Sequence, residues 1–64
     1  MIALVQATTA EDVFINAKYV EFIQQGRDST KISMASGNVI YVTRDAYSLI
    51  ILVQQELLDS QNQS

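Results

Sequence analysis

The feature that most constrains this chain is its apolar last third. Residues 46–58, AYSLIILVQQELL, hold nine apolar residues in thirteen. On a helix of 3.6 residues per turn, one set of them recurs at the spacing of a core-facing stripe. This set consists of Ala46, Leu49, Ile50, Val53 and Leu57. The segment is therefore predicted to be an amphipathic helix that packs on the rest of the fold.

A second apolar flank lies on the same predicted helix, about 100° round from the first stripe. It consists of Tyr47, Ile51 and Leu58, while Leu52 lies apart from both sets on the polar side. One interpretation is that the flank completes the core, because a helix on a sheet can bury a wide arc. We favour contact with a second copy, because so small a core has little room for both sets. Leu52 is then either a second interface contact or an isolated exposed leucine.

The chain is small and lacks the usual stabilising links. Its 64 residues make one domain, and a domain of this size buries only about 60% of its unfolded surface. The sequence has no Cys and no His, so disulfides and the common zinc sites built from these residues are excluded. Oligomerisation is the remaining way to bury more apolar surface, so we expect an obligate homodimer or higher oligomer with no folded monomer at micromolar concentration.

The charge and the lack of long apolar segments predict a cytoplasmic protein. Seven acidic and four basic residues give a net charge of −3. The start, MIALVQATTA, lacks the positively charged segment of a secretory signal. The longest apolar run, residues 49–53, is too short to span a bilayer. We expect neither export nor membrane insertion.

Alternating apolar residues predict four or five short strands before the helix. The first is the run at residues 1–5, which a polar turn at residues 7–11 follows. Further strands are predicted at residues 12–15, 20–25, 30–35 and 39–43, with a tight connection at 17–19. In the strand 20–25, Val20 and Phe22 are expected on one face, with Glu21 and Ile23 on the other.

The last two strands are predicted to form a hairpin. Gly37 and Asn38 indicate a two-residue turn, because Gly permits the positive φ that such turns require. The strand 39–43, VIYVT, is apolar on both faces, so we expect it at the centre of the sheet.

The predicted helix has a clear start and a polar end. Asp45 is a good N-cap, and the helix is expected to run from Ala46 to about Leu58. Residues 59–64 contain no apolar side chain and are predicted to be a disordered tail. The predicted fold is thus a single α+β domain over residues 1–58, a small twisted antiparallel sheet followed by one C-terminal helix.

Five short motifs follow one another in a characteristic order. They are Phe14-Ile15-Asn16, Val20-Glu21-Phe22-Ile23, Ser29-Thr30-Lys31-Ile32, Ser36-Gly37-Asn38 and Tyr41-Val42. This order, over roughly residues 13 to 53, resembles the FlbD family of small bacterial flagellar and swarming motility proteins. The resemblance implies an accessory protein of flagellar assembly or motor function and not an enzyme.

The chain departs from the family pattern in two places. Where the family carries Leu-Asn-Gly between the first two strands, this chain has the sequence ATTAE at residues 7–11. Its helix begins with Arg44-Asp45 and Ala46-Tyr47 in place of the family's acidic pair. The strand and hairpin pattern is also similar to that of DNA-binding LytTR-type domains. An oligomeric nucleic-acid-binding regulator is therefore the alternative interpretation.

No group of residues indicates catalysis. The sequence has no His, and its carboxylates, cations and tyrosines form no recognisable catalytic constellation. Its serines lack the His that would activate a nucleophile of the triad type. Glu11 and Asp12 are adjacent, but neighbours on an extended segment point to opposite sides. We expect no catalytic residue, no metal and no cofactor.

Basic residues near the predicted third strand are the basis of the nucleic-acid alternative. Lys18, Arg27 and Lys31 flank this strand, and Tyr19 and Tyr41 offer rings for base stacking. The chain has only four cations, so a footprint on a polyanion would need several subunits.

For a protein partner, the polar residues of the same region are the candidate contacts. Glu21, Gln25 and Arg27 are expected to form a polar rim there. The sequence as a whole favours a small, non-enzymatic interaction or regulatory accessory protein that self-associates through its C-terminal helix.

Overall fold

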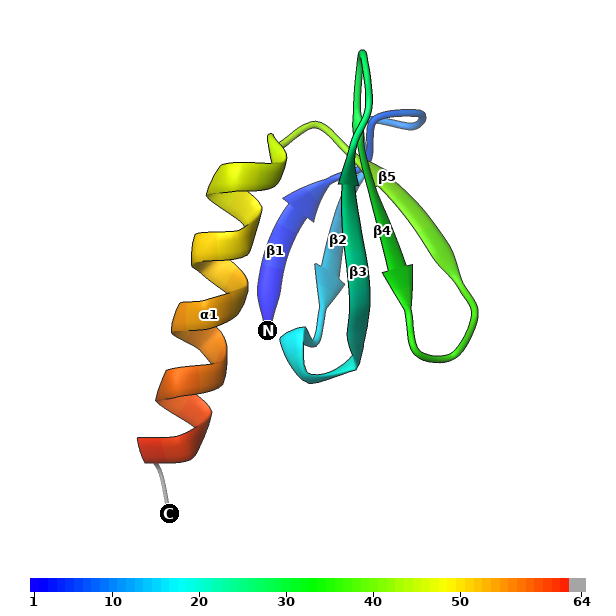
Figure 1. Cartoon of the computed structure of the whole chain (residues 1–64). Coiled ribbons are helices and arrows are strands. Elements are labelled where there is room, and N and C mark those ends of the chain that lie inside the picture. The colour runs from blue at the N-terminus through cyan, green and yellow to red at the C-terminus, as the bar shows by residue number, and fades with distance from the viewer. Residues whose placement is uncertain (63–64) are drawn as a thin grey trace.

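The computed structural model describes residues 1–62 of the chain. The elements follow in the order β1 (Ile2–Val5), β2 (Asp12–Ile15), the 3₁₀ helix η1 (Ala17–Tyr19), β3 (Val20–Gln25), β4 (Thr30–Met34), β5 (Val39–Val42) and α1 (Ala46–Asn62). Figure 1 shows the strands fanned out beside one another, with α1 standing along one side of them. The predicted α+β class, with antiparallel strands followed by one C-terminal helix, is confirmed.

The strands form two antiparallel sheets, one of β1 and β2 and one in the order β3-β4-β5. Backbone hydrogen bonds join them where the chain leaves β1. The Ala7 N–H donates to the Tyr41 carbonyl at 2.8 Å, and the Thr43 N–H donates to the Val5 carbonyl at 3.0 Å. Within the larger sheet β4 is the central strand. An antiparallel bridge between Gln6 and Val42 also places β5 next to the end of β1, so β5 has a neighbour on each side, as predicted for residues 39–43.

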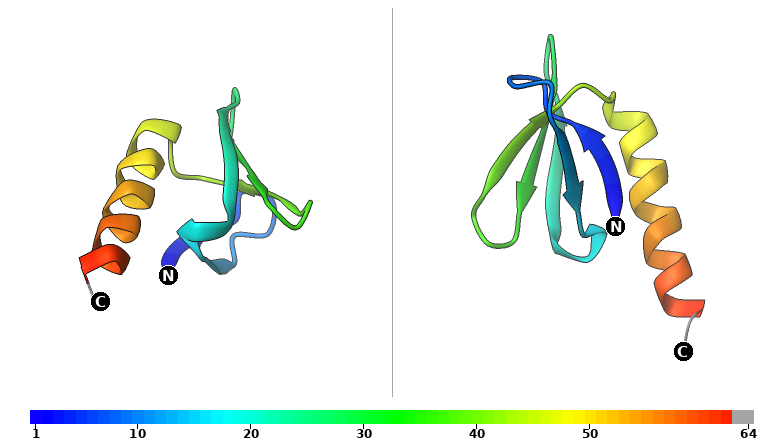
Figure 2. Two further views of the ribbon diagram at one scale, coloured as in Figure 1. Left: turned by 60° about the horizontal axis from the view of Figure 1, so that its bottom comes forward. Right: turned by 180° about the vertical axis from the view of Figure 1, so that it is seen from behind.

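The core lies between the strands and α1, and nearly every element contributes to it. Its buried members are Ile2 and Leu4 of β1, Ile15 of β2, Ala17 of η1, Ile32 of β4, Val42 of β5 and Leu49 of α1. The helix packs against β1, β3 and η1, and the two views of Figure 2 show it on one side of the strands. α1 therefore closes the side of the sheets on which these apolar side chains meet.

A β-bulge changes which residues of β3 face the core. The pairing with β4 shifts between Val20, opposite Met34, and Phe22, opposite Ser33, so Glu21 is an extra residue in the ladder. Val20 and Ile23 consequently both pack against the core, while Phe22 is exposed. The predicted pairing of Val20 with Phe22 on one face is wrong because it assumed an uninterrupted alternation.

The β4–β5 hairpin is present, but its turn is one residue longer than predicted. The Met34 N–H donates to the Asn38 carbonyl, and the Gly37 N–H donates to the Met34 carbonyl, both at 2.9 Å. Gly37 has a φ of 96°, which places it in the region that favours glycine. A three-residue loop ending in a left-handed glycine therefore replaces the predicted two-residue turn.

The core face of α1 is rotated by about 60° from the stripe that the sequence indicated. Leu49 is buried, and Leu52 and Val53 pack against the core. The placement of Leu52 on the polar side is therefore wrong. Ile50 and Leu57, which were expected in the core, are exposed. Two apolar sectors lie side by side on this helix, and apolar spacing alone does not distinguish the one that meets the strands.

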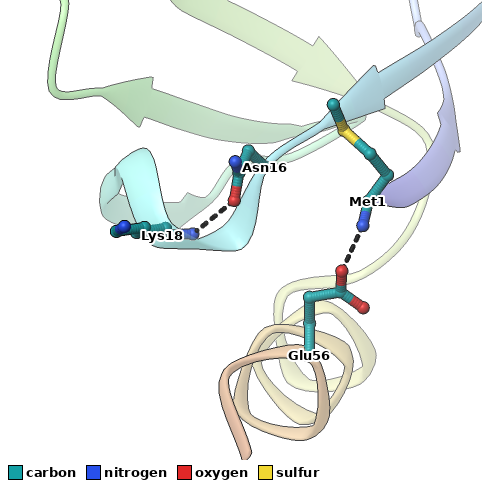
Figure 3. Close-up of polar contacts among 4 residues, drawn as sticks. All are labelled: Met1, Asn16, Lys18 and Glu56. Atoms are coloured by element: carbon teal, nitrogen blue, oxygen red, sulfur yellow. Dashed lines mark hydrogen bonds and ion pairs between the residues drawn. The ribbon is translucent and has the colours of Figure 1, made fainter. Parts of the chain in front are cut away.

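The helix is also longer than predicted. It continues to Asn62 and so includes residues 59–62 of the predicted disordered tail, while residues 63–64 lie outside the described part of the chain. Its C-terminal half is linked to the start of β1 by an ion pair between the Met1 ammonium and Glu56, which Figure 3 shows. In the same view, Asn16 accepts a hydrogen bond at 3.1 Å from the Lys18 N–H and so caps η1.

Two side chains bind the first amide groups of α1. The Asp45 carboxylate accepts from the Ser48 N–H at 3.1 Å, which confirms Asp45 as the N-cap. The Gln25 Oε1 atom, at the end of β3, accepts from the Ala46 N–H at 2.7 Å. Gln25, a predicted partner-binding residue, is exposed, and its side chain fixes the helix start to the sheet.

We predict that Gln25→Ala lowers the free energy of unfolding by about 1–2 kcal/mol, because the Ala46 N–H loses its acceptor. Urea denaturation at a fixed protein concentration measures the change. Gln24→Ala is the matched control, since Gln24 is exposed on the same strand and lies opposite Lys31, away from the start of α1. Equal stability of the two variants would contradict this role for Gln25.

The β1–β2 turn holds an alanine in an unfavourable backbone conformation. Ala10 has a φ of 59°, and it is the one non-glycine residue with positive φ among residues 1–62. Its N–H donates to the Gln6 carbonyl at 3.0 Å, which closes the turn. The left-handed conformation costs an alanine roughly 1–2 kcal/mol.

We therefore predict that Ala10→Gly raises the free energy of unfolding by about 0.5–1 kcal/mol, since the relief of strain exceeds the entropic cost of glycine. Ala7→Gly, in the same turn but without positive φ, is the control and should destabilise the protein or leave it unchanged. Thermal unfolding of both variants tests this. The account of the turn fails if Ala10→Gly is the less stable of the two.

Candidate interaction surface

Five large apolar side chains are exposed along one side of α1. They are Tyr47, Ile50, Ile51, Leu57 and Leu58, which are 80%, 41%, 55%, 38% and 58% exposed. We call this set the helix strip. The expectation that Tyr47, Ile51 and Leu58 lie outside the core of a single chain is confirmed. Ile50 and Leu57 widen the surface beyond the predicted flank.

The helix strip has the spacing of a helix-pairing surface. Together with Gln54, its members recur at intervals of three and four residues over about 16 Å of helix. Gln54, an uncharged amide, is exposed in the middle of the helix strip. The strip contains no charged residue, because the acids of α1 lie elsewhere: Glu56 binds Met1, and Asp59 lies beside Leu52 and Met1. A flat apolar surface on a rigid helix can bind another helix.

The start of α1 is electrostatically favourable. Hydrogen bonds from Ser48 lower the pKa of Asp45 below its ordinary value of 3.8. The bond from the Ser48 N–H has the largest effect, and the bond from the Ser48 side chain has the next largest. The carboxylate also lies at the positive end of the helix dipole. Ionised Asp45 therefore stabilises the first turn, which carries Tyr47.

A second apolar surface lies on the outer face of the β3-β4-β5 sheet. Phe22, Ser33 and Val39 are cross-strand neighbours there, with Lys31 and Tyr41 in the next row. The Lys31 Nζ atom lies 5.8 Å from the centroid of the Phe22 ring, which is within cation–π range. This face is smaller than the helix strip, and a cation lies in the middle of it.

A third apolar surface is a shallow groove of about 440 Å³ beside β2 and η1. The large side chains that line it are Phe14, Tyr19, Met34 and Ile40, together with polar groups that include Asn16 and Asn38. Phe14 and Tyr19 are exposed. Because its lining comes from several elements and two loops, this groove is less regular than the helix strip.

The polar residues predicted to bind a partner do not form one site. Lys18 lies in η1 and Arg27 in the β3–β4 turn, at opposite ends of a strand about 20 Å long. Glu21 is the bulge residue, Gln25 caps α1, and Lys31 lies over Phe22 on the outer sheet face. The cations are therefore not gathered into the footprint that the nucleic-acid alternative needs.

The described residues hold no acidic cluster of the size needed for a metal ion. Residues 1–62 contain no cluster of three or more acidic side chains that could hold a metal ion. No side-chain polar atom buried in this part of the chain lacks a hydrogen-bond partner. The structure of residues 1–62 also contains no helix with the length and hydropathy needed to cross a membrane.

Two members of the helix strip were missed from the sequence. Ile50 and Leu57 were assigned to the core because they share spacing with Leu49 and Val53. The rotation accompanies the ion pair between Glu56 and Met1, which brings the Glu56 side of the helix toward the start of β1. That pairing joins residues 55 positions apart, so no local pattern indicates it.

In comparisons with known proteins, no family model, no curated protein and no solved structure matches this chain.

We predict that the charge of Asp45 stabilises the fold only above its lowered pKa. Because the pKa is lower in the folded state, the contribution is complete above about pH 4 and is lost as the pH falls through the folded pKa. Wild type should resist urea better than Asp45→Asn at about pH 6, and the difference should shrink steadily as the pH falls below about 4. A difference that does not change with pH would contradict this account of the helix start.

Proposed function

We propose that this protein is a small, non-enzymatic interaction module that binds a second copy of itself through the helix strip. The observation that carries the proposal is the exposure of Tyr47, Ile50, Ile51, Leu57 and Leu58 on one face of a single helix. Contiguous apolar surfaces of this kind on small proteins usually mark interaction sites.

The charge distribution supports a second copy as the partner. The chain has a net charge of −3, so two copies repel each other at long range. The helix strip carries no acid, and two strips can therefore meet without placing like charges in contact. An isologous contact also covers the same surface on both subunits, so neither strip remains exposed.

The core supports an equilibrium between a folded monomer and a folded dimer. It does not require two chains to assemble before either one folds. Leu49, Ile32 and Val42 are fully buried within one chain, away from the helix strip. The strip can thus be altered without opening the core. Self-association then adds stability that depends on protein concentration.

The proposed setting is an accessory role in the cytoplasm of a bacterium, in flagellar assembly or motility. The resemblance of residues 13 to 53 to the FlbD pattern supports the motility setting. The absence of Cys from the sequence is consistent with the reducing cytoplasm.

Sedimentation equilibrium tests the proposed self-association. We predict a monomer–dimer equilibrium for the wild type at micromolar concentration. Ile51→Glu and Leu58→Glu should each raise the dissociation constant at least about 100-fold, because each of two subunits loses about 1.5 kcal/mol of apolar burial. Circular dichroism should show that both variants remain folded.

The matched control is Gln55→Glu, which adds the same charge to the same helix outside the helix strip. Gln55 is exposed beside Leu52 and Met1, on the side of α1 that carries Asp59. This variant should dimerise within about threefold of the wild type. A wild-type protein that stays monomeric up to millimolar concentration would overturn the proposal. Equal weakening of the dimer by Ile51→Glu, Leu58→Glu and Gln55→Glu would also overturn it.

A further inference from the structure

We infer that the two α1 helices pair in antiparallel orientation, with Gln54 of each copy at the twofold axis. This inference rests on the proposed function and adds the geometry of the contact. It follows from the order of residues along the helix strip, from the charges at the helix ends and from the position of α1 beside the strands.

The helix strip has the same spacing when read from either end. Ile50 and Ile51 precede Gln54 by four and three residues, and Leu57 and Leu58 follow it by three and four. When position 54 lies opposite its own copy, antiparallel helices place Ile50 opposite Leu58 and Ile51 opposite Leu57. Each large aliphatic side chain of one copy then meets another, with the amides at the centre.

The helix ends favour the antiparallel orientation. A parallel pair would bring both Asp45 carboxylates and both positive helix N-termini to the same end. An antiparallel pair instead places the N-terminus of each helix beside the C-terminal end of the other, so the dipoles attract. Tyr47 of each copy then lies against the last helical turn of its partner.

The position of α1 in the fold favours the same arrangement. Both Figure 1 and the rear view in Figure 2 show the C-terminal end of α1 extending past the ends of the strands. In a parallel pair, the two sets of strands would lie at the same end of the helix pair. In an antiparallel pair, the strands of each copy lie beside the extended end of the partner helix. The strands of the two copies therefore do not overlap.

Gln54 determines the register of this pair. It is the one polar side chain within an otherwise apolar surface, and its amide carries both a donor and an acceptor. At the twofold axis, each amide can donate to the carbonyl oxygen of its copy. Any shift of register would bury both amides against aliphatic side chains without partners, which is costly.

Single-cysteine variants test the geometry, because the natural sequence contains no cysteine. Under mild oxidation with glutathione, Gln54→Cys should form a disulfide-linked dimer at least about ten times faster than Tyr47→Cys. In the antiparallel pair the two copies of residue 47 lie roughly 20 Å apart along the axis, which a disulfide cannot span. A mixture of Ile50→Cys and Leu58→Cys should form the mixed dimer in preference to either homodimer.

The outcomes separate this inference from the proposed function. Crosslinking of Tyr47→Cys as fast as Gln54→Cys would overturn the antiparallel geometry in favour of a parallel pair. Failure of the Ile50→Cys and Leu58→Cys mixture, which keeps Gln54, to favour the mixed dimer would overturn the geometry. If the wild type still sediments as a dimer that Ile51→Glu weakens, self-association stands. A wild type that stays monomeric in the same sedimentation series would overturn both the antiparallel geometry and the proposed self-association.

Discussion

The fold depends on the packing of one face of α1 against the strands. Leu49 is fully buried in a cluster that includes Ile32 and Val42, from two different strands of the larger sheet. The two sheets are short, and together with η1 they leave one side of the apolar cluster to be covered. The helix supplies that cover, and Gln25 and Asp45 fix its first turn in place. Without this contact, so small a chain has no continuous core.

The same helix must also serve a second surface. The strands cover only one sector of α1, and apolar side chains continue round the helix onto the helix strip. A helix that only closed a core would be expected to carry polar residues there. The sector beside the core face therefore has a separate reason to be apolar, and self-association provides one. The uncharged Gln54 in the middle of the strip fits this interpretation, because a register-setting amide is of use only where another surface lies against it.

Much of the architecture could be predicted from the sequence, because it depends on local patterns. The alternation in DVFI at residues 12–15 correctly places Val13 and Ile15 on the inner face and Phe14 outside. Asp45 was correctly identified as the helix cap. The errors arise where the decisive contact is distant in sequence or breaks the alternation. The bulge at Glu21 reverses the face of Phe22, and the Gly37 turn lengthens the hairpin.

The candidate site was predicted only in part, for the same reason. Tyr47, Ile51 and Leu58 were recognised as surplus to the core, since their spacing separates them from Leu49. The assignments of Ile50, Leu52 and Leu57 required knowledge of the sector of α1 that meets β1, β3 and η1. The hydrogen bond between Gln25 and Ala46 joins residues 21 positions apart, so no local pattern predicts it. Sequence spacing defines the sectors of a helix, and the tertiary contacts decide how each sector is used.

Methyl NMR on dilution tests the central claim most directly, because it locates the contact on the molecule. As the concentration falls from millimolar to micromolar, the methyl resonances of Ile50, Ile51, Leu57 and Leu58 should shift as these side chains become exposed to water. Those of Ile32 and Leu49, in the core, should stay constant. Concentration-independent resonances on the helix strip, or shifts confined to Val39 on the outer sheet face, would contradict the account.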